Sequence, residues 1–107
     1  MTTHTEPTVL DVPERSLFEI YVDGSPAGVA GYSMKNPQLI VFTHTEIDDA
    51  FEGKGLGSTL VRAALDAART RGLAVRPDCP FVRGYIARHP DVYLDLVPEE
   101  LRPRLGL

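Results

Sequence analysis

The residues best suited to chemistry in this chain form a glycine-rich turn near the middle of the sequence. The turn reads Glu52-Gly53-Lys54-Gly55-Leu56-Gly57 and is followed by Ser58. Glycines at alternate positions let the backbone bend tightly and let a ligand approach it closely. The segment after the turn has a helical pattern, and a helix start offers unpaired N–H groups and a positive dipole end. This combination predicts a cradle for a pyrophosphate group.

Two common phosphate-binding patterns do not match this turn. The P-loop requires Ser or Thr directly after its Gly-Lys pair, but Lys54 is followed by Gly55. The dinucleotide pattern requires GxGxxG and a fold with several βαβ units, whereas the spacing here is GxGxG. A simple strand-to-helix turn that binds nothing is the alternative interpretation of the glycines taken alone.

The elements that position the turn follow from the periodicity of the apolar residues. Alternating patterns bounded by turn signals predict strands over residues 9–12, 17–22, 27–34 and 39–47. A helical stripe then predicts one long helix over 55–71, and Gly72 is a suitable residue just beyond its end.

The rest of the chain predicts smaller elements. A short strand is expected over residues 73–75 and again over 80–82, with a second helix over 82–88 that ends before Pro90. The proline-containing tail is expected to form a turn or short helix on the surface. Together the segments predict an α+β fold, a mostly antiparallel sheet with a long helix and a shorter one.

Length and charge restrict the domain organisation and the partners. The 107 residues fit one domain over residues 9–107, after a polar and disordered N-terminus over residues 1–8. Residues 1–50 carry two basic and eight acidic side chains, whereas residues 51–107 carry nine basic and seven acidic ones. This asymmetry suits a polyanionic cofactor near the turn and a neutral or cationic substrate near the acidic half, although solvated faces explain it equally well. The absence of a basic run argues against nucleic-acid binding.

Other features of the composition narrow the cellular setting. No apolar run approaches the ~20 residues of a membrane span, so no membrane association is expected. The N-terminus lacks the pattern of a signal peptide, and the single Cys79 fits a reducing compartment, so the predicted location is cytoplasmic. Cys79, His44 and His89 show no paired ligand spacing, so no metal is expected.

The order of these segments resembles the GNAT acetyltransferase superfamily. That superfamily combines an antiparallel meander with a (Q/R)xxGx(G/A) turn that opens a helix, and Glu52 stands here in place of the usual Gln or Arg. Three runs, His44-Thr45-Glu46-Ile47, Cys79-Pro80-Phe81-Val82 and the segment from Ile86 to Tyr93, resemble the small single-domain GNAT-like family. The resemblance covers roughly residues 15–97. This family lacks the first helices that build the acceptor pocket in larger members, so the resemblance does not identify the substrate.

The resemblance implies acetyl-CoA as co-substrate. In the superfamily, backbone N–H groups of the turn hold the pyrophosphate of CoA. This role transfers to Gly53, Lys54, Gly55, Leu56, Gly57 and Ser58. Lys54 would either add charge to a phosphate or be solvated.

Two side chains on the strand before the turn could act as a general base. His44 and Glu46 are two positions apart, so both are predicted to point to one face of the strand, together with Ile40 and Phe42. The superfamily commonly draws its base from this strand, and an amine must lose a proton to attack a thioester. The alternative is that His44 is a hydrogen-bonded sheet residue and Glu46 an exposed strand end.

Cys79 and Tyr85 complete the candidate catalytic residues. The resemblance places Cys79 near the thioester, where a thiolate could accept the acetyl group covalently, although free cysteines are often buried packing residues. In many superfamily members a tyrosine at the position of Tyr85 donates a proton to the leaving thiolate, and a packing role for Tyr85 is the alternative.

Three hypotheses of function follow. The first is an acetyl-CoA-dependent N-acetyltransferase that acts on a small-molecule or protein amine, as a monomer or weak dimer. The second is a non-catalytic acyl-CoA-binding module, and the third is a structural domain whose turn binds nothing.

Overall fold

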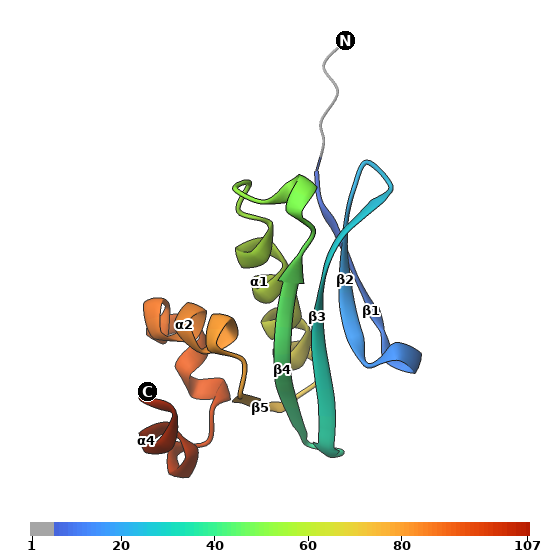
Figure 1. Cartoon of the computed structure of the whole chain (residues 1–107). Helices are drawn as coiled ribbons and strands as arrows, with labels where there is room; N and C mark the ends of the chain where they lie inside the picture. Colours follow the sequence, from blue (N-terminus) through green and yellow to red (C-terminus); the bar gives the residue numbers. More distant parts are fainter. Residues whose placement is uncertain (1–5) are drawn as a thin grey trace.

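The computed structural model describes residues 6–107, which form a five-stranded sheet with a long helix behind it and smaller helices beside one edge (Figure 1). The strands lie in sequence order across the sheet and are β1 (Thr8–Val12), β2 (Leu17–Val22), β3 (Ser25–Asn36), β4 (Leu39–Ile47) and β5 (Ala74–Pro77). Neighbouring strands from β1 to β4 are antiparallel, whereas β5 runs parallel to β4. The helices are α1 (Leu56–Thr70), α2 (Pro80–Arg88), α3 (Pro90–Tyr93) and α4 (Arg102–Leu105). The predicted α+β class is confirmed.

Several predicted boundaries differ from the structure, and β3, for example, runs over Ser25–Asn36 rather than 27–34, while β5 runs over Ala74–Pro77 rather than 73–75. Thr8 is the first residue of β1, so the prediction that residue 8 is disordered is wrong, and residues 1–5 lie outside the described residues. The strand predicted over 80–82 is the first turn of α2. Pro80 occupies the start of this helix, where the missing N–H costs no hydrogen bond and the fixed φ suits the helical backbone.

Helix α1 packs its apolar stripe against the sheet. Its buried residues follow the helical spacing that the sequence predicted: Leu56, Gly57, Leu60, Val61, Ala64, Leu65 and Ala68. The helix ends because Gly72 adopts a left-handed conformation, with φ of +70°. The N–H of Leu73 then bonds to the carbonyl of Ala68 at 2.9 Å, and the N–H of Gly72 bonds to that of Arg69 at 3.0 Å. This pair of bonds satisfies carbonyls that the helix end would leave unpaired.

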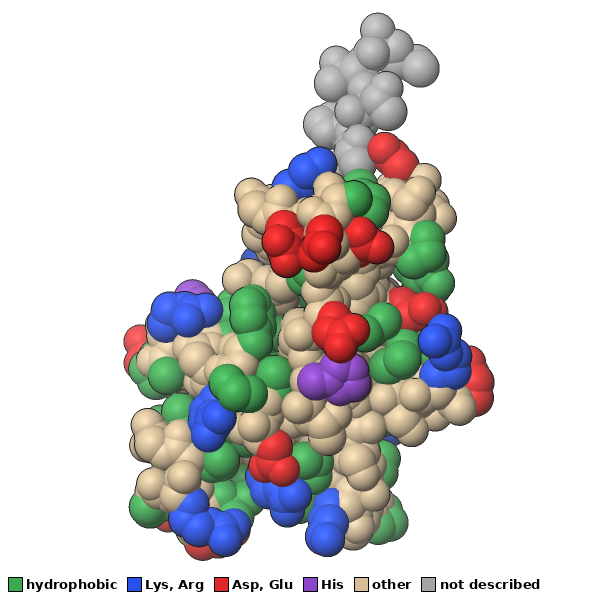
Figure 2. All heavy atoms as spheres, viewed as in Figure 1, with side chains coloured by type: hydrophobic (Ala, Val, Ile, Leu, Met, Phe, Trp, Pro, Cys, Tyr) green, Lys and Arg blue, Asp and Glu red, His purple; other side chains and the backbone are tan. Residues whose placement is uncertain are grey.

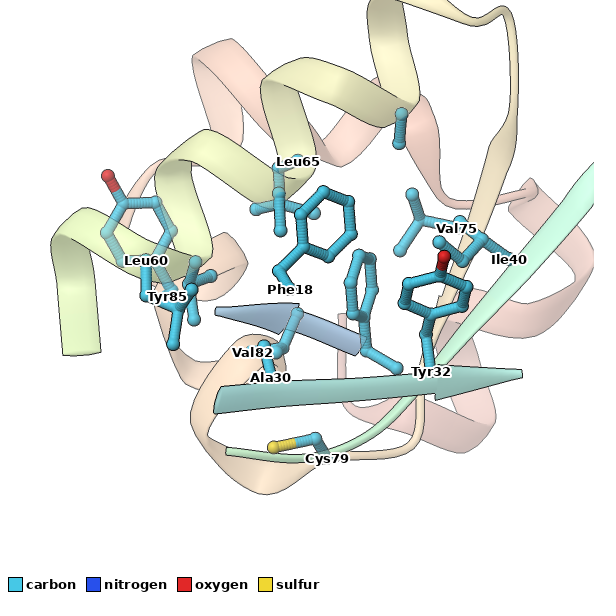
Figure 3. Packing of buried hydrophobic residues seen from close by; sticks show 14 of the residues in the cluster. Phe18, Ala30, Tyr32, Ile40, Leu60, Leu65, Val75, Cys79, Val82 and Tyr85 are labelled. Carbon is cyan, nitrogen blue, oxygen red and sulfur yellow. The ribbon is translucent and has the colours of Figure 1, made fainter. Parts of the chain in front are cut away.

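The core lies between α1 and the sheet and contains a group of aromatic rings (Figure 3). The ring centroids of Phe18 and Tyr32 are 5.4 Å apart, and those of Phe18 and Phe42 are 6.3 Å apart. Leu65 of α1 is fully buried over these rings. Truncating such a side chain to alanine typically lowers the free energy of unfolding by about 2–5 kcal/mol. This packing therefore fixes the position of α1 on the sheet, and with it the position of the glycine turn that precedes the helix.

The proline-containing tail over residues 98–107 forms short helical turns whose residues are exposed or half-buried, as the sequence predicted, but the segment just before it is buried. Tyr93, Leu96 and Val97 are buried in the same core as α1 and α2. The hydroxyl of Tyr93 donates to Asp66 of α1 at 2.8 Å, and Arg69 of α1 bonds to Asp95 at 2.8 Å. The sequence pattern did not indicate the burial of Leu96 and Val97, because the apolar residues of this segment show no strand or helix period.

Candidate functional site

A cavity of about 510 Å³ lies where the end of β4, the glycine turn and the first turns of α1 and α2 meet. Its lining residues are Thr45, Ile47, Phe51, Glu52, Gly53, Gly55, Leu56, Gly57, Ser58 and Phe81. All of the predicted cofactor-binding residues except Lys54 belong to this lining. The structure therefore places the turn and the free end of β4 around one shared space.

The first two glycines of the turn are required by its backbone. Gly53 has a φ of +81° and Gly55 a φ of +72°, in the left-handed region that side chains disfavour. A Cβ at either position would meet no atom within 4 Å, so the space in front of the turn is open. Gly57 differs, because it is helical and a Cβ there would lie 2.7 Å from the ring of Phe81. The three glycines were predicted to serve the turn together. In the structure, Gly53 and Gly55 allow its left-handed backbone, whereas Gly57 makes room for the ring of Phe81.

The start of α1 is suited to an anion. Gly55 is the N-cap residue, no side chain caps the helix, and its first turn contains no acidic residue. The first intrahelical bond of the backbone runs from the N–H of Thr59 to the carbonyl of Gly55, at 3.2 Å. The N–H groups of Leu56, Gly57 and Ser58 precede it and have no partner within the helix. Three donors and the positive helix end therefore converge at the cavity.

Lys54 lies on the other side of the turn. It lines a neighbouring hollow of about 760 Å³, which shares Phe51 and Leu56 with the first cavity. Its ammonium group sits 5.8 Å from the ring centroid of Phe51. The predicted contact of Lys54 with a phosphate is therefore possible only for a ligand that extends across the turn into this hollow.

Strands β4 and β5 separate at the inner end of the cavity. Their pairing ends at Phe42 and Pro77. The N–H of Cys79 still bonds to the carbonyl of Phe42 at 2.9 Å, but α2 begins at the next residue. The edge of β4 over residues 43–47 therefore has no strand partner on the α2 side in the described structure. This opening is where an extended ligand could enter the sheet.

Thr45 and Cys79 meet at this opening. The Thr45 hydroxyl lies 3.4 Å from the Cys79 sulfur, and either atom could donate the hydrogen bond. Thr45 lines the cavity, whereas Cys79 is only 3% exposed and occupies the N-cap position of α2. The thiol of Cys79, predicted to lie near a thioester, is thus separated from the cavity by the side chain of Thr45. Whether it carries an acyl group stays a prediction.

A β-bulge at Thr43 changes the face on which His44 and Glu46 lie. Tyr32 of β3 pairs with Phe42, but Gly31 pairs with His44, so β4 contains one extra residue. Beyond the bulge, Thr45 and Ile47 turn toward the cavity, and His44 and Glu46 are exposed on the opposite face. The prediction that these two share a face with Ile40 and Phe42 is wrong, because a single inserted residue reverses the alternation.

His44 has a defined position on this open face. Its imidazole lies over Gly31, where a Cβ would come within 2.3 Å of Cε1 of the ring. Its Nδ1 is 3.3 Å from the Thr43 hydroxyl. If Nδ1 carries the hydrogen and donates it to Thr43, Nε2 is free to accept a proton from a substrate.

Tyr85 lies in the core rather than in the cavity. Its side chain is 7% exposed, and its ring packs 4.5 Å from His89 and 5.8 Å from Tyr93 between centroids. It is not part of the cavity lining. The packing role is therefore observed, and the proposed proton donation by Tyr85 stays a prediction.

Four residues of the cavity lining were not predicted from the sequence: Thr45, Ile47, Phe51 and Phe81. Thr45 faces the cavity only because of the bulge, which no sequence pattern indicated. Phe81 was assigned to a strand, although Pro80 at a helix start was a usable signal that Phe81 belongs to the first turn of α2.

The described residues contain no group of three or more His, Cys, Asp or Glu side chains arranged to hold a metal ion. Among residues 6–107, no helix has both the length and the apolar character needed to cross a membrane.

Comparisons with known proteins agree with the fold and the turn. Residues 17–96 match the family model described as GCN5-related N-acetyltransferase. Protein NATD1 from Mus musculus is 27% identical over 78 residues, covering 72% of this chain and 71% of the relative. The Homo sapiens protein NATD1 is 29% identical over 59 residues, covering 55% of this chain and 52% of the relative.

Two solved structures are similar. A GCN5-like candidate N-acetyltransferase from Staphylococcus aureus superposes with a TM-score of 0.62 at 22% identity, covering 85% of this chain and 87% of its own. Ard1 from Thermoplasma volcanium gives a TM-score of 0.52 at 27% identity, with 58% of this chain matched to only 43% of the Ard1 chain. The family model covers most of the chain, so this protein belongs to the GCN5-related N-acetyltransferase family.

Proposed function

We propose that the protein binds acetyl-CoA in the cavity beside the glycine turn and transfers the acetyl group to an amine. The observation that carries this proposal is the continuity of the cavity. It runs from the N–H donors at the start of α1 to Thr45 on the unpaired edge of β4. The pyrophosphate of CoA would bind the helix start, and its uncharged pantetheine arm would extend toward Thr45. The amide groups of that arm could then bond to the free backbone edge of β4.

The acceptor would approach from the open face of the sheet. The face behind β4 is filled by the core and α1, so only the other side gives access to a thioester at the strand edge. His44 and Glu46 lie on that accessible side. In the transfer, the amine nitrogen bonds to the thioester carbon, the C–S bond breaks, and CoA leaves as the thiol. One of these two side chains would remove the amine proton.

Charge near the cavity favours a cationic acceptor. A second hollow, of about 230 Å³, shares Ile47 with the first and is lined by Glu46 and Asp48 but by no basic residue. Figure 2 shows acidic side chains gathered above the end of β4, with basic side chains mainly lower on the same face and over α2. An amine that is protonated in solution would be attracted to this side of the molecule.

One experiment separates binding from a structural turn. Isothermal titration with acetyl-CoA should show binding to the wild-type protein and its loss in Gly55→Val, because the branched side chain disfavours a φ of +72° and projects into the open space of the cavity. Gly72→Val is the matched control, because it places the same residue at a φ of +70° beyond the far end of α1. It should lose a comparable stability, about 1 kcal/mol, and keep its affinity. Equal affinity in both variants would remove the turn from the proposed site.

A non-catalytic acyl-CoA-binding module is the second candidate. The lining of the cavity favours this candidate, because the described residues place only one ionisable side chain there, that of Glu52, and a catalytic site needs groups that exchange protons. Release of free CoA thiol from acetyl-CoA, measured across a panel of amines, distinguishes the two. Binding by calorimetry without thiol release for any amine would support the module.

A further inference from the structure

Phe81 is a large apolar side chain that remains exposed at the cavity. Its exposed fraction is 43%, although the side chains around it in α2, Val82 and Ile86, are buried. The other large apolar residues that are exposed in the described structure, Leu10, Met34 and Val92, do not line this cavity. An aromatic ring that lines a cavity offers a bound ligand a large apolar surface to pack against.

The ring of Phe81 lies directly on the first turn of α1. A Cβ at Gly57 would be 2.7 Å from Cζ of this ring and 3.3 Å from each Cε. Gly57 is buried and helical, so its backbone has no need of glycine, which is a poorer helix former than alanine. The ring of Phe81 is instead the group that a side chain at residue 57 would displace. The absence of a side chain at Gly57 therefore allows the ring of Phe81 to pack against the first turn of α1.

The position of Phe81 lies between the two ends of the proposed ligand. Gly57 belongs to the N–H donors at the start of α1, and Cys79, two residues before Phe81, contacts Thr45 at the inner end of the cavity. An extended molecule that joins these ends must pass the ring.

We propose that Phe81 is a cofactor-binding residue whose ring contacts the pantetheine arm of an acyl-CoA, and that Gly57 is glycine in order to seat this ring. The inference rests on the proposed function and assigns a chemical class to this part of the site. The matching ligand group is uncharged and partly apolar and is linked to a pyrophosphate. A nucleotide that lacks the arm has no group to place against Phe81.

Titration calorimetry with two ligands tests this assignment. CoA contains the arm, whereas adenosine 3′-phosphate 5′-diphosphate carries the same nucleotide and pyrophosphate without it. Phe81→Ala should weaken CoA binding about tenfold, because an aromatic contact is lost, and should change the affinity for adenosine 3′-phosphate 5′-diphosphate less than about twofold. Phe81→Leu should have an intermediate effect on CoA. Met34→Ala removes an apolar side chain of similar exposure on β3 and should change neither affinity.

A double variant tests the role of Gly57. Gly57→Ala should weaken CoA binding by displacing the ring, and Gly57→Ala combined with Phe81→Ala should bind CoA no more weakly than Phe81→Ala alone. Unchanged or tighter CoA binding in Phe81→Ala, an equal loss for both ligands, or additive losses in the double variant would each overturn the inference. These results leave the proposed function standing if wild-type protein binds acetyl-CoA. A wild-type protein that binds neither ligand would instead reject the proposed function and this inference with it. Circular dichroism and the thermal midpoint confirm that each variant is folded.

Discussion

The imidazole of His44, a proposed general base, lies directly over Gly31. A substitution at Gly31 can therefore displace the imidazole without removing it. A Cβ at residue 31 would lie 2.3 Å from Cε1, 2.6 Å from Nδ1 and 3.2 Å from Nε2 of the imidazole. Ordinary contact begins at 3.4 Å, so Gly31→Ala forces the ring to move by about 1 Å or to rotate away. His44 is exposed and can do so with little loss of packing. The expected change in the free energy of unfolding is below about 1 kcal/mol.

The catalytic cost should be much larger than the cost in stability. A misplacement of about 1 Å in a reacting group can lower the rate about 10²-fold, which corresponds to about 2.7 kcal/mol in the activation free energy. We therefore expect Gly31→Ala to lower kcat about 10²-fold while the affinity for acetyl-CoA stays the same. His44→Ala should lower kcat by ~10²–10⁴-fold, the range for loss of a general base. Glu46→Gln, the other candidate on this face, should then have a smaller effect.

The assay is the release of CoA thiol at saturating acetyl-CoA, with the best amine from the acceptor screen. The control is the combination of Gly31→Ala and His44→Ala, which should be no slower than His44→Ala alone because both changes act through one imidazole. A shift of the His44 ring resonances by NMR shows that the side chain has moved. A native kcat in Gly31→Ala, with the ring displaced, would refute His44 as the base.

Three further outcomes are expected. Burial and a hydrogen bond donated to Asp11 raise the pKa of Tyr32 to about 12, so the folded chain holds this proton more tightly than the unfolded chain, whose tyrosines titrate near ~10. Stability is then complete below pH ~10 and falls by an amount on the order of 2 kcal/mol as the pH rises toward ~12, and urea unfolding of Tyr32→Phe should lack that part of the loss. If acyl transfer passes through Cys79, intact-mass spectrometry will show one acetyl group that Cys79→Ala removes together with activity, whereas native activity in that variant makes the transfer direct. Lys54→Ala should weaken CoA binding by roughly 1 kcal/mol, since its charge-assisted contact would be solvent-exposed, and a larger loss by calorimetry would contradict a peripheral role.

The parts of the fold with a strong local period could be predicted from the sequence. Strands β2 and β4 have the expected bounds, and α1 lies within one residue of the expected helix at each end. These elements carry alternating or helical patterns over six residues or more, so the buried face is readable without knowledge of any partner. The glycine turn was readable for the same reason, because left-handed conformations at Gly53 and Gly55 are a local property.

The orientation of the candidate catalytic residues could not be predicted in this way. The face that His44 occupies depends on the bulge at Thr43, and the bulge is a matter of register between β4 and β3. Thr45 and Cys79 are 34 positions apart, and their contact depends on where β4 and β5 separate. Such relations depend on pairing between distant segments, which a reading of one strand at a time does not contain.

The separation of β4 from β5 connects the sequence to the chemistry of the site. Pro77 and Pro80 bracket the point where the chain leaves the sheet, and neither has an N–H to continue the ladder. If β5 continued beside β4, its backbone would occupy the edge that the proposed ligand uses, and Phe81 would lie in a strand rather than on Gly57. The prolines therefore do more than end two elements. They leave one strand edge open, start α2 beside it, and so bring Cys79 and Phe81 to the cavity that begins at the glycine turn.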